Sequence, residues 1–164
     1  MKRLNKGLLA AIAVLVITAA VLMIVGGKNM IVGKNIRKED ISDFYFTYDA
    51  STYPPYFQRY RFYTEEGKYY FYHEKREGDH WPLTEADATV KGTIELTDEE
   101  WERFYELLKD GKAEKRQEHL ESGGRGPWLY LYWKKDRGKY QEFSFASYGK
   151  RLEFEEFCKE LAEQ

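Results

Sequence analysis

The chain has 164 residues with 26 Lys and Arg against 28 Asp and Glu, so its net charge of −2 is close to zero. The charges are segregated: the first 38 residues hold seven basic residues and no acidic one, whereas the rest of the chain carries a net charge of −9. An acidic body argues against nucleic-acid binding, because phosphate binding needs a dense cationic surface. No aromatic residue precedes Phe44. The sequence therefore predicts one aromatic-rich domain behind a basic N-terminal region.

The N-terminal segment has the length and composition of a membrane anchor. Residues 7–27 carry no charge, and residues 8–25 form an apolar run interrupted only by Thr18. About 20 apolar residues are needed for a helix to cross a bilayer. We interpret residues 1–6 as a basic n-region and residues 7–27 as a retained transmembrane signal anchor. A cleaved signal peptide is the alternative, but its apolar region is typically only about 7 to 15 residues long.

The orientation of this anchor rests on the basic residues that flank it. Three precede the span and four follow it, so the positive-inside rule does not decide by count alone. We favour a cytoplasmic N-terminus because its basic residues directly adjoin the apolar run. This makes the chain a single-pass protein of the cell membrane with an extracytoplasmic C-terminal domain, and the opposite orientation is the alternative. Residues 28–42 are expected to form a stalk, and residues 43–164 the domain.

The first half of the domain has the alternation of a β-sheet. Residues 43–48 are predicted as a strand, and the prolines in residues 52–56 predict a loop. Residues 57–64 and 69–75 predict a hairpin. In its first arm, Arg59 and Arg61 alternate with Tyr60 and Phe62, which indicates a sheet with one polar face. Residues 88–96 alternate in the same way and predict a further strand.

A helix is expected directly after this strand. Thr97 and Glu100 have the spacing of a capping box, and Gly111 has the position of a C-terminal cap. Between them the apolar residues recur with helical spacing and predict one buried stripe. These residues are Trp101, Phe104, Tyr105 and Leu108.

The rest of the chain repeats a hairpin followed by a helix. Residues 112–127 are predicted as a loop, residues 128–133 and 139–145 as a hairpin, and residues 152–162 as a helix. The apolar stripe of that helix consists of Phe154, Phe157, Cys158 and Leu161. Cys158 is the only cysteine, so no intramolecular disulfide is possible. The predicted fold class is α+β, an antiparallel β-sheet with two helices packed on one face.

No motif for catalysis or cofactor binding occurs in this sequence. The three histidines, His73, His80 and His119, do not have the spacing of a metal site. Neither a Gly-x-Ser-x-Gly motif nor a phosphate-binding loop is present. We therefore predict no catalytic residue, no metal and no cofactor.

Aromatic residues near the loops are the strongest functional signal. Exposed rings beside polar groups give a large contact area at a low entropic cost. The alternative is that these rings only cover the edges of the sheet. The candidate ligand-binding residues are Tyr53, Tyr56, Trp81, Arg125 and Trp128, with the arginine available for an anionic group.

The two ends of the chain resemble those of a group of bacterial proteins. The apolar segment, the short stretch after it and the C-terminal runs FSFASYG (residues 143–149) and FEEFCKEL (residues 154–161) carry the resemblance. They are similar to small membrane-anchored extracytoplasmic proteins without an assigned function. The resemblance implies display at the cell surface and a compact α+β body, and it transfers no functional residue.

These features lead to three functional hypotheses. The first is a membrane-anchored, non-catalytic domain that binds an envelope protein, a peptide or a glycan. The second is an envelope hydrolase that uses His80 as a base oriented by Asp79. The third is a regulator whose acidic body inhibits a basic membrane partner.

Overall fold

The computed structural model describes residues 12, 14–16, 30–114, 127–134 and 136–164. The predicted n-region and nearly all of the predicted anchor lie outside the described residues. Of the anchor, residue 12 and residues 14–16 are described, and they are helical with exposed apolar side chains. No helix within the described part of the chain is long and apolar enough to cross a membrane.

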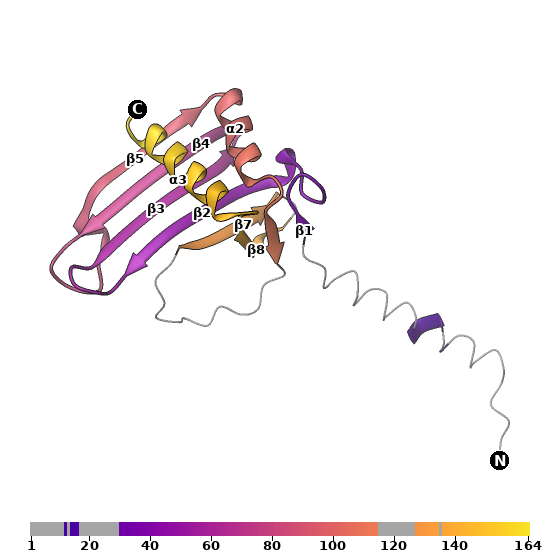
Figure 1. Cartoon of the computed structure of the whole chain (residues 1–164), viewed down its shortest axis with the longest axis horizontal. Coiled ribbons are helices and arrows are strands. Elements are labelled where there is room, and N and C mark those ends of the chain that lie inside the picture. Colours follow the sequence, from indigo (N-terminus) through magenta and orange to yellow (C-terminus); the bar gives the residue numbers. More distant parts are fainter. Residues whose placement is uncertain (1–11, 13, 17–29, 115–126, 135) are drawn as a thin grey trace, which may run out of the picture.

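The described strands form one sheet in which every neighbouring pair of strands is antiparallel (Figure 1). Their order across the sheet is β1-β6-β8-β7-β2-β3-β4-β5. The strands are β1 (Met30–Ile31), β2 (Ile41–Ala50), β3 (Tyr56–Glu65), β4 (Lys68–Glu77), β5 (Ala88–Leu96), β6 (Lys112–Glu114), β7 (Trp128–Trp133) and β8 (Asp136–Ser144). Two short 3-10 turns, η1 (Lys38–Asp40) and η2 (Glu85–Asp87), precede β2 and β5.

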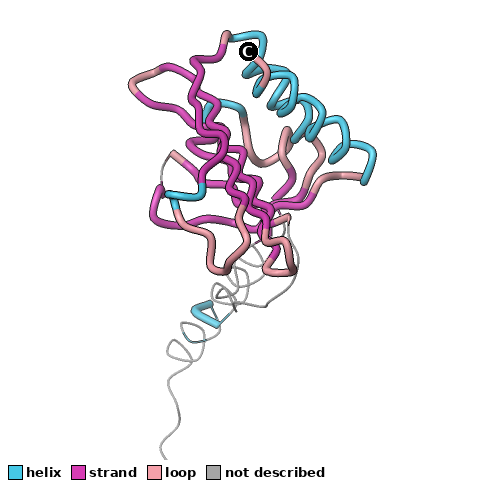
Figure 2. Tube along the Cα trace, turned by 90° about the vertical axis from the view of Figure 1, so that its left-hand side faces the viewer, coloured by secondary structure: helices cyan, strands magenta, loops and turns pink. Residues whose placement is uncertain are grey.

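Two helices, α2 (Asp98–Leu108) and α3 (Tyr148–Ala162), lie on the same side of this sheet (Figure 2). The α+β class with an antiparallel sheet is thus confirmed. The predicted start of α2 is confirmed, because Thr97 caps this helix by accepting a hydrogen bond from Glu100 N. Helix α3 begins four residues before the predicted start at residue 152, because Ser147 caps it by accepting a hydrogen bond from Lys150 N.

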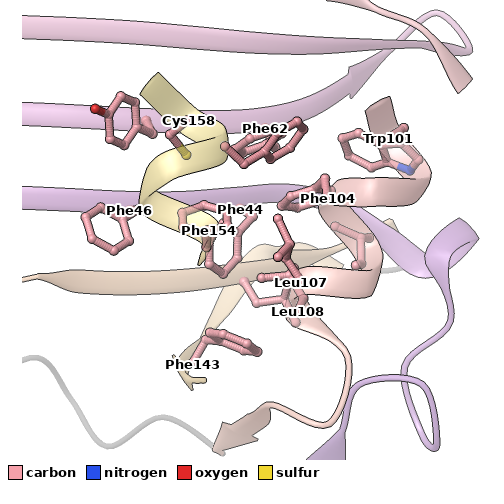
Figure 3. Packing of buried hydrophobic residues seen from close by; sticks show 14 of the residues in the cluster. Phe44, Phe46, Phe62, Trp101, Phe104, Leu107, Leu108, Phe143, Phe154 and Cys158 are labelled. Carbon is pink, nitrogen blue, oxygen red and sulfur yellow. The ribbon is translucent and has the colours of Figure 1, made fainter. Parts of the chain in front are cut away.

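Aromatic side chains fill the space between the sheet and the helices. Alternate residues of β2 and β3 point toward α2 and α3, as Figure 3 shows for Phe44, Phe46 and Phe62. The rings of Phe62 and Phe104 are stacked with their centroids 4.2 Å apart. The predicted stripe of α3 is fully buried in this core, and so is the stripe of α2 except for the half-buried Tyr105.

Residues 30–42 pack against the domain, whereas the sequence suggested a stalk. Val32 and Ile36 are completely buried. Val32 N donates a hydrogen bond to Gly111 O (3.0 Å), and Tyr105 Oη donates one to Ile36 O (3.2 Å). The segment has no aromatic residue, but its aliphatic side chains bury enough surface to join the core. The expectation of a stalk is therefore wrong for this part of the chain.

The end of α2 also differs from the expectation. Asp110, not Gly111, takes the left-handed conformation after the helix, with φ = 67°. Gly111 is buried, and a Cβ at this position would lie 2.3 Å from Cζ of Phe143. This glycine is needed because an aromatic ring packs on its backbone, and not because of its φ angle.

Candidate functional site

Three of the predicted binding residues lie at one end of the sheet. Tyr53 lies in the β2–β3 connection and is 81 % exposed, and Trp81 lies in the β4–β5 connection and is 49 % exposed. Tyr56 is the first residue of β3, where it pairs with the last residues of β2 and β4. This register brings both connections to the same end of the sheet (Figure 1).

The other two predicted residues cannot be placed in this site. Arg125 lies outside the described residues. Trp128 opens β7 opposite Thr47 of β2, and its side chain lies outside the described part of the chain. The assignment of these two residues to a binding site stays a prediction.

A groove between α3 and the sheet opens at this same end. We call it the α3 groove. Its volume is about 730 Å³, within the range of about 300–1,000 Å³ that is typical of ligand pockets. Strands β2, β3, β4 and β5 provide its floor, and α3 forms one wall. The apolar part of the floor includes Phe46, Tyr60 and Val90.

A short row of hydrogen-bonded side chains crosses the floor. Tyr56 Oη donates to Gln58 Oε1, and Gln58 Nε2 donates to Tyr60 Oη. These residues alternate along β3 and so point to the same side of the sheet. Burial raises the pKa of Tyr60 far above its ordinary value, so this hydroxyl stays protonated at any physiological pH. The row therefore supplies neutral hydrogen-bonding groups to a mostly apolar groove.

His73 adds a neutral ring to the groove. Its imidazole packs on the ring of Tyr60 with a centroid distance of 5.0 Å. Burial and the charge of Lys75 lower the pKa of His73, so the ring is uncharged near pH 7. Its Nε2 is buried, and among the described residues it has no hydrogen-bond partner. The sequence alone does not single out His73 as a groove residue, because only the pairing of β3 with β4 brings it beside Tyr60.

Most charged residues that line the groove are paired with a carboxylate or a basic group on their own element. Arg151 Nε donates to Glu155 Oε1 over 2.7 Å, within α3. Two further basic residues, Lys75 and Lys159, contact carboxylates of their own elements at 3.3 and 3.1 Å. Of the charged residues that line the groove, only Glu163 has no ion pair within the described part of the chain, so the groove suits a ligand without a strong net charge.

The proposed base of the hydrolase alternative lies in the β4–β5 connection. His80 Nδ1 is 3.4 Å from Asp79 Oδ1, and His80 Nε2 is 3.5 Å from Asp87 Oδ2. Asp87 also accepts hydrogen bonds from the backbone and the hydroxyl of Thr84, which caps η2. The contact of His80 with Asp87 is thus part of the capped turn η2, and it can be explained without a catalytic role for His80.

Two potential nucleophiles near the C-terminus, Ser147 and Cys158, also have structural roles. Cys158 is completely buried, and this burial raises its pKa well above the ordinary value. Ser147 caps α3 through its hydroxyl. Within the described ranges, no three His, Cys, Asp or Glu side chains converge on a potential metal site.

The face of the sheet opposite the helices carries a second cluster, which we call the tyrosine–arginine face. Its members alternate with the core residues along five strands, and all of them are half-buried. The alternation of Arg59 and Arg61 with core rings was the sequence signal for this face, but the neighbouring strands could not be assigned without the register. The members are Tyr45, Phe57, Arg59, Arg61, Tyr63, Tyr70, Tyr72, Arg76, Tyr130, Tyr132 and Tyr140.

No family model matches this chain, and no curated protein and no solved structure matches it either.

Proposed function

We propose that this chain is a non-catalytic binding domain of the bacterial cell envelope, anchored in the membrane by residues 7–27, and that its ligand occupies the α3 groove. The observation that carries this proposal is the groove itself, an apolar floor of ligand-pocket size crossed by a row of neutral hydrogen-bonding groups. The exposed rings of Tyr53 and Trp81 at the same end of the sheet support it.

The chemistry of the groove indicates the kind of ligand. Its apolar floor favours an apolar group, because burying such a group stabilises a complex by about 25 cal/mol per Å². The side chains of Gln58 and Tyr60 would pair with the polar groups that flank it, and the paired charges at the rim favour a ligand without a large net charge. A peptide segment with an apolar side chain has these properties. Tyr53 and Trp81 would contact the part of the peptide that extends beyond the groove.

We expect Val90→Lys to weaken ligand binding at least about tenfold, equivalent to about 1.4 kcal/mol. Val90 lines the floor and is 41 % exposed, so a lysine there places a charge beside the apolar ligand without disturbing the core. The measurement is a thermal-shift screen of the full chain, in a non-ionic detergent, against short peptides and cell-wall glycan fragments. Affinities of the hits are then determined by titration calorimetry.

The matched control for this experiment is Thr89→Lys. Thr89 precedes Val90 on β5, is exposed and does not line the groove. We expect this variant to bind as the wild type does. Hits that bind Val90→Lys and wild type equally well would show that the α3 groove is not the binding site.

The proposed location makes its own prediction about the C-terminus. In the proposed orientation the basic n-region stays in the cytoplasm and the C-terminus lies outside the cell. Protease added to intact protoplasts should therefore remove a tag placed after Gln164. The tag is followed by immunoblotting, with lysed cells as the control for cleavage. Loss of the tag only after lysis would contradict an extracytoplasmic domain and would move the search to cytosolic partners.

A further inference from the structure

The tyrosine–arginine face lies opposite the side that α2 and α3 cover (Figure 2). Its rings form a row that runs across the strands. Tyr45 of β2 contacts Tyr132 of β7 with a centroid distance of 5.6 Å, and Tyr132 contacts Tyr140 of β8 at the same distance. On the other side of Tyr45, the guanidinium of Arg61 lies 5.2 Å from its ring centroid. The rings thus span three adjacent strands, β2-β7-β8, and Arg61 extends the row to a fourth strand, β3.

Two of the three arginines on this face are neutralised by carboxylates within the chain. Arg61 Nε donates to Asp43 Oδ1 over 2.7 Å, and Arg76 Nε donates to Glu74 Oε1 over the same distance. In a doubly hydrogen-bonded pair of this kind, the carboxylate balances most of the charge of the guanidinium. These two arginines therefore stabilise the face and contribute little to attracting an anion.

Arg59 differs from the other two. Its Nε contacts Thr47 Oγ1 at 3.4 Å, and its guanidinium lies 5.0 Å from the ring of Phe57 and 5.8 Å from that of Tyr45. Within the described residues it forms no direct ion pair, so its terminal nitrogens keep hydrogen-bonding capacity, although its charge also acts on Asp49 and Glu74 of the neighbouring strands. The rings on both sides hold the planar group in place, which lowers the entropic cost of binding.

We propose that the tyrosine–arginine face binds an anionic polysaccharide, with an acidic group of the polymer on Arg59 and sugar rings along the row of tyrosines. A guanidinium matches the geometry of carboxylate, sulfate and phosphate groups. Tyrosine rings offer a flat surface to the C–H groups of a sugar and hydroxyls to its polar edge. The row across four strands fits an extended polymer better than a compact ligand. This proposal is independent of the α3 groove, because the two sites lie on opposite faces of the sheet.

The acidic character of the domain favours a polysaccharide over a nucleic acid or an anionic membrane. A nucleic acid or an anionic membrane binds a protein through many phosphate groups at once, so the protein needs a dense basic surface. From Glu39 onward this chain carries a net charge of −9, and on this face Arg59 is the one arginine that forms no direct ion pair within the described residues. Affinity must then come from one ionic contact together with ring stacking.

The test measures binding of the full chain, in a non-ionic detergent, to immobilised dextran sulfate, with uncharged dextran as the reference surface. We expect wild type to bind dextran sulfate and not dextran, and Arg59→Gln to bind at least tenfold more weakly. Arg103→Gln is the matched control. Arg103 is an arginine of α2, on the other side of the sheet, where it pairs with Glu160. This control should bind as the wild type does.

Each other outcome overturns the proposal. Equal binding by wild type and Arg59→Gln would place the contact elsewhere, for example on the basic N-terminal residues, and no binding by wild type would exclude the ligand class. Equally tight competition by a single-stranded oligonucleotide would show a general affinity for polyanions.

Two further variants complete the test. Arg59→Lys keeps the charge but loses the planar group, and it should bind several-fold more weakly even if Arg59→Gln does not fold. Val90→Lys should leave dextran sulfate binding unchanged, which separates failure here from failure of the groove.

Discussion

Replacing Gly111 by alanine should lower the free energy of unfolding by roughly 3 kcal/mol, the upper part of the range for overpacking a core. The new Cβ would lie 2.3 and 2.5 Å from two ring carbons of Phe143 and 2.8 Å from the carbonyl oxygen of Leu108. The ring cannot easily move away, because it is 5 % exposed and packs against Phe44 and Phe145 with centroid distances of 5.3 and 5.1 Å. The measurement is urea unfolding of the full chain in a non-ionic detergent, monitored by tryptophan fluorescence.

A second glycine provides the matched control. A Cβ added at Gly92, in the middle of β5, meets nothing within 4 Å. Gly92→Ala should therefore be neutral or stabilising by up to about 1 kcal/mol, because alanine loses less backbone entropy on folding. Combining Gly111→Ala with Phe143→Leu should cost less than the two changes added together, because the smaller side chain makes room for the methyl group. Strict additivity of the two would contradict a direct clash.

The parts of the fold that the sequence predicts are those with local signals. The capping box is one, since Thr97 N donates to Glu100 Oε2 over 2.8 Å and Glu100 N donates to Thr97 Oγ1 over 3.1 Å. The alternation of Arg59 and Arg61 with buried rings is another. By contrast, Val32 and Ile36 carry no periodic pattern, and only their contacts with the turn after α2 and with Tyr105 bring them into the core.

The candidate sites depend on contacts between residues far apart in the sequence. Tyr60, His73 and Glu155 line one groove, although the first and the last are nearly a hundred positions apart. Their meeting depends on the register between strands and on where α3 crosses the sheet, and neither leaves a local signal. The loop residues Tyr53 and Trp81 could be chosen from composition alone. That they lie at the same end of the sheet follows from the pairing of β3 with β2 and β4.

Glu74, the buried partner of Arg76 under the tyrosine–arginine face, should be the carboxylate of the described residues that contributes most to stability. It is 3 % exposed, and it accepts hydrogen bonds from Arg76 Nε (2.7 Å) and Tyr72 Oη (2.9 Å). Burial disfavours its charged form, but these hydrogen bonds and the charges of Arg76 and Arg59 outweigh burial and hold its pKa below the ordinary value of 4.5. Removing one partner of a buried ion pair leaves the other charge unpaired, so we expect Glu74→Gln to cost about 3 kcal/mol near pH 7.

The lowered pKa of Glu74 also predicts how the stability of the protein depends on pH. Because the pKa of Glu74 is lower in the folded state, its contribution is fully present above the unfolded pKa of 4.5 and is lost as the pH falls through the folded pKa. The difference in unfolding free energy between wild type and Glu74→Gln should therefore shrink as the pH is lowered below 4.5, as measured by urea unfolding across this range. Glu77→Gln is the matched control, since Glu77 lies on the same strand in an exposed pair with Lys75 and should cost less than about 1 kcal/mol. A difference for Glu74→Gln that stays constant as the pH falls would show that the effect comes from packing and not from the charge of this carboxylate.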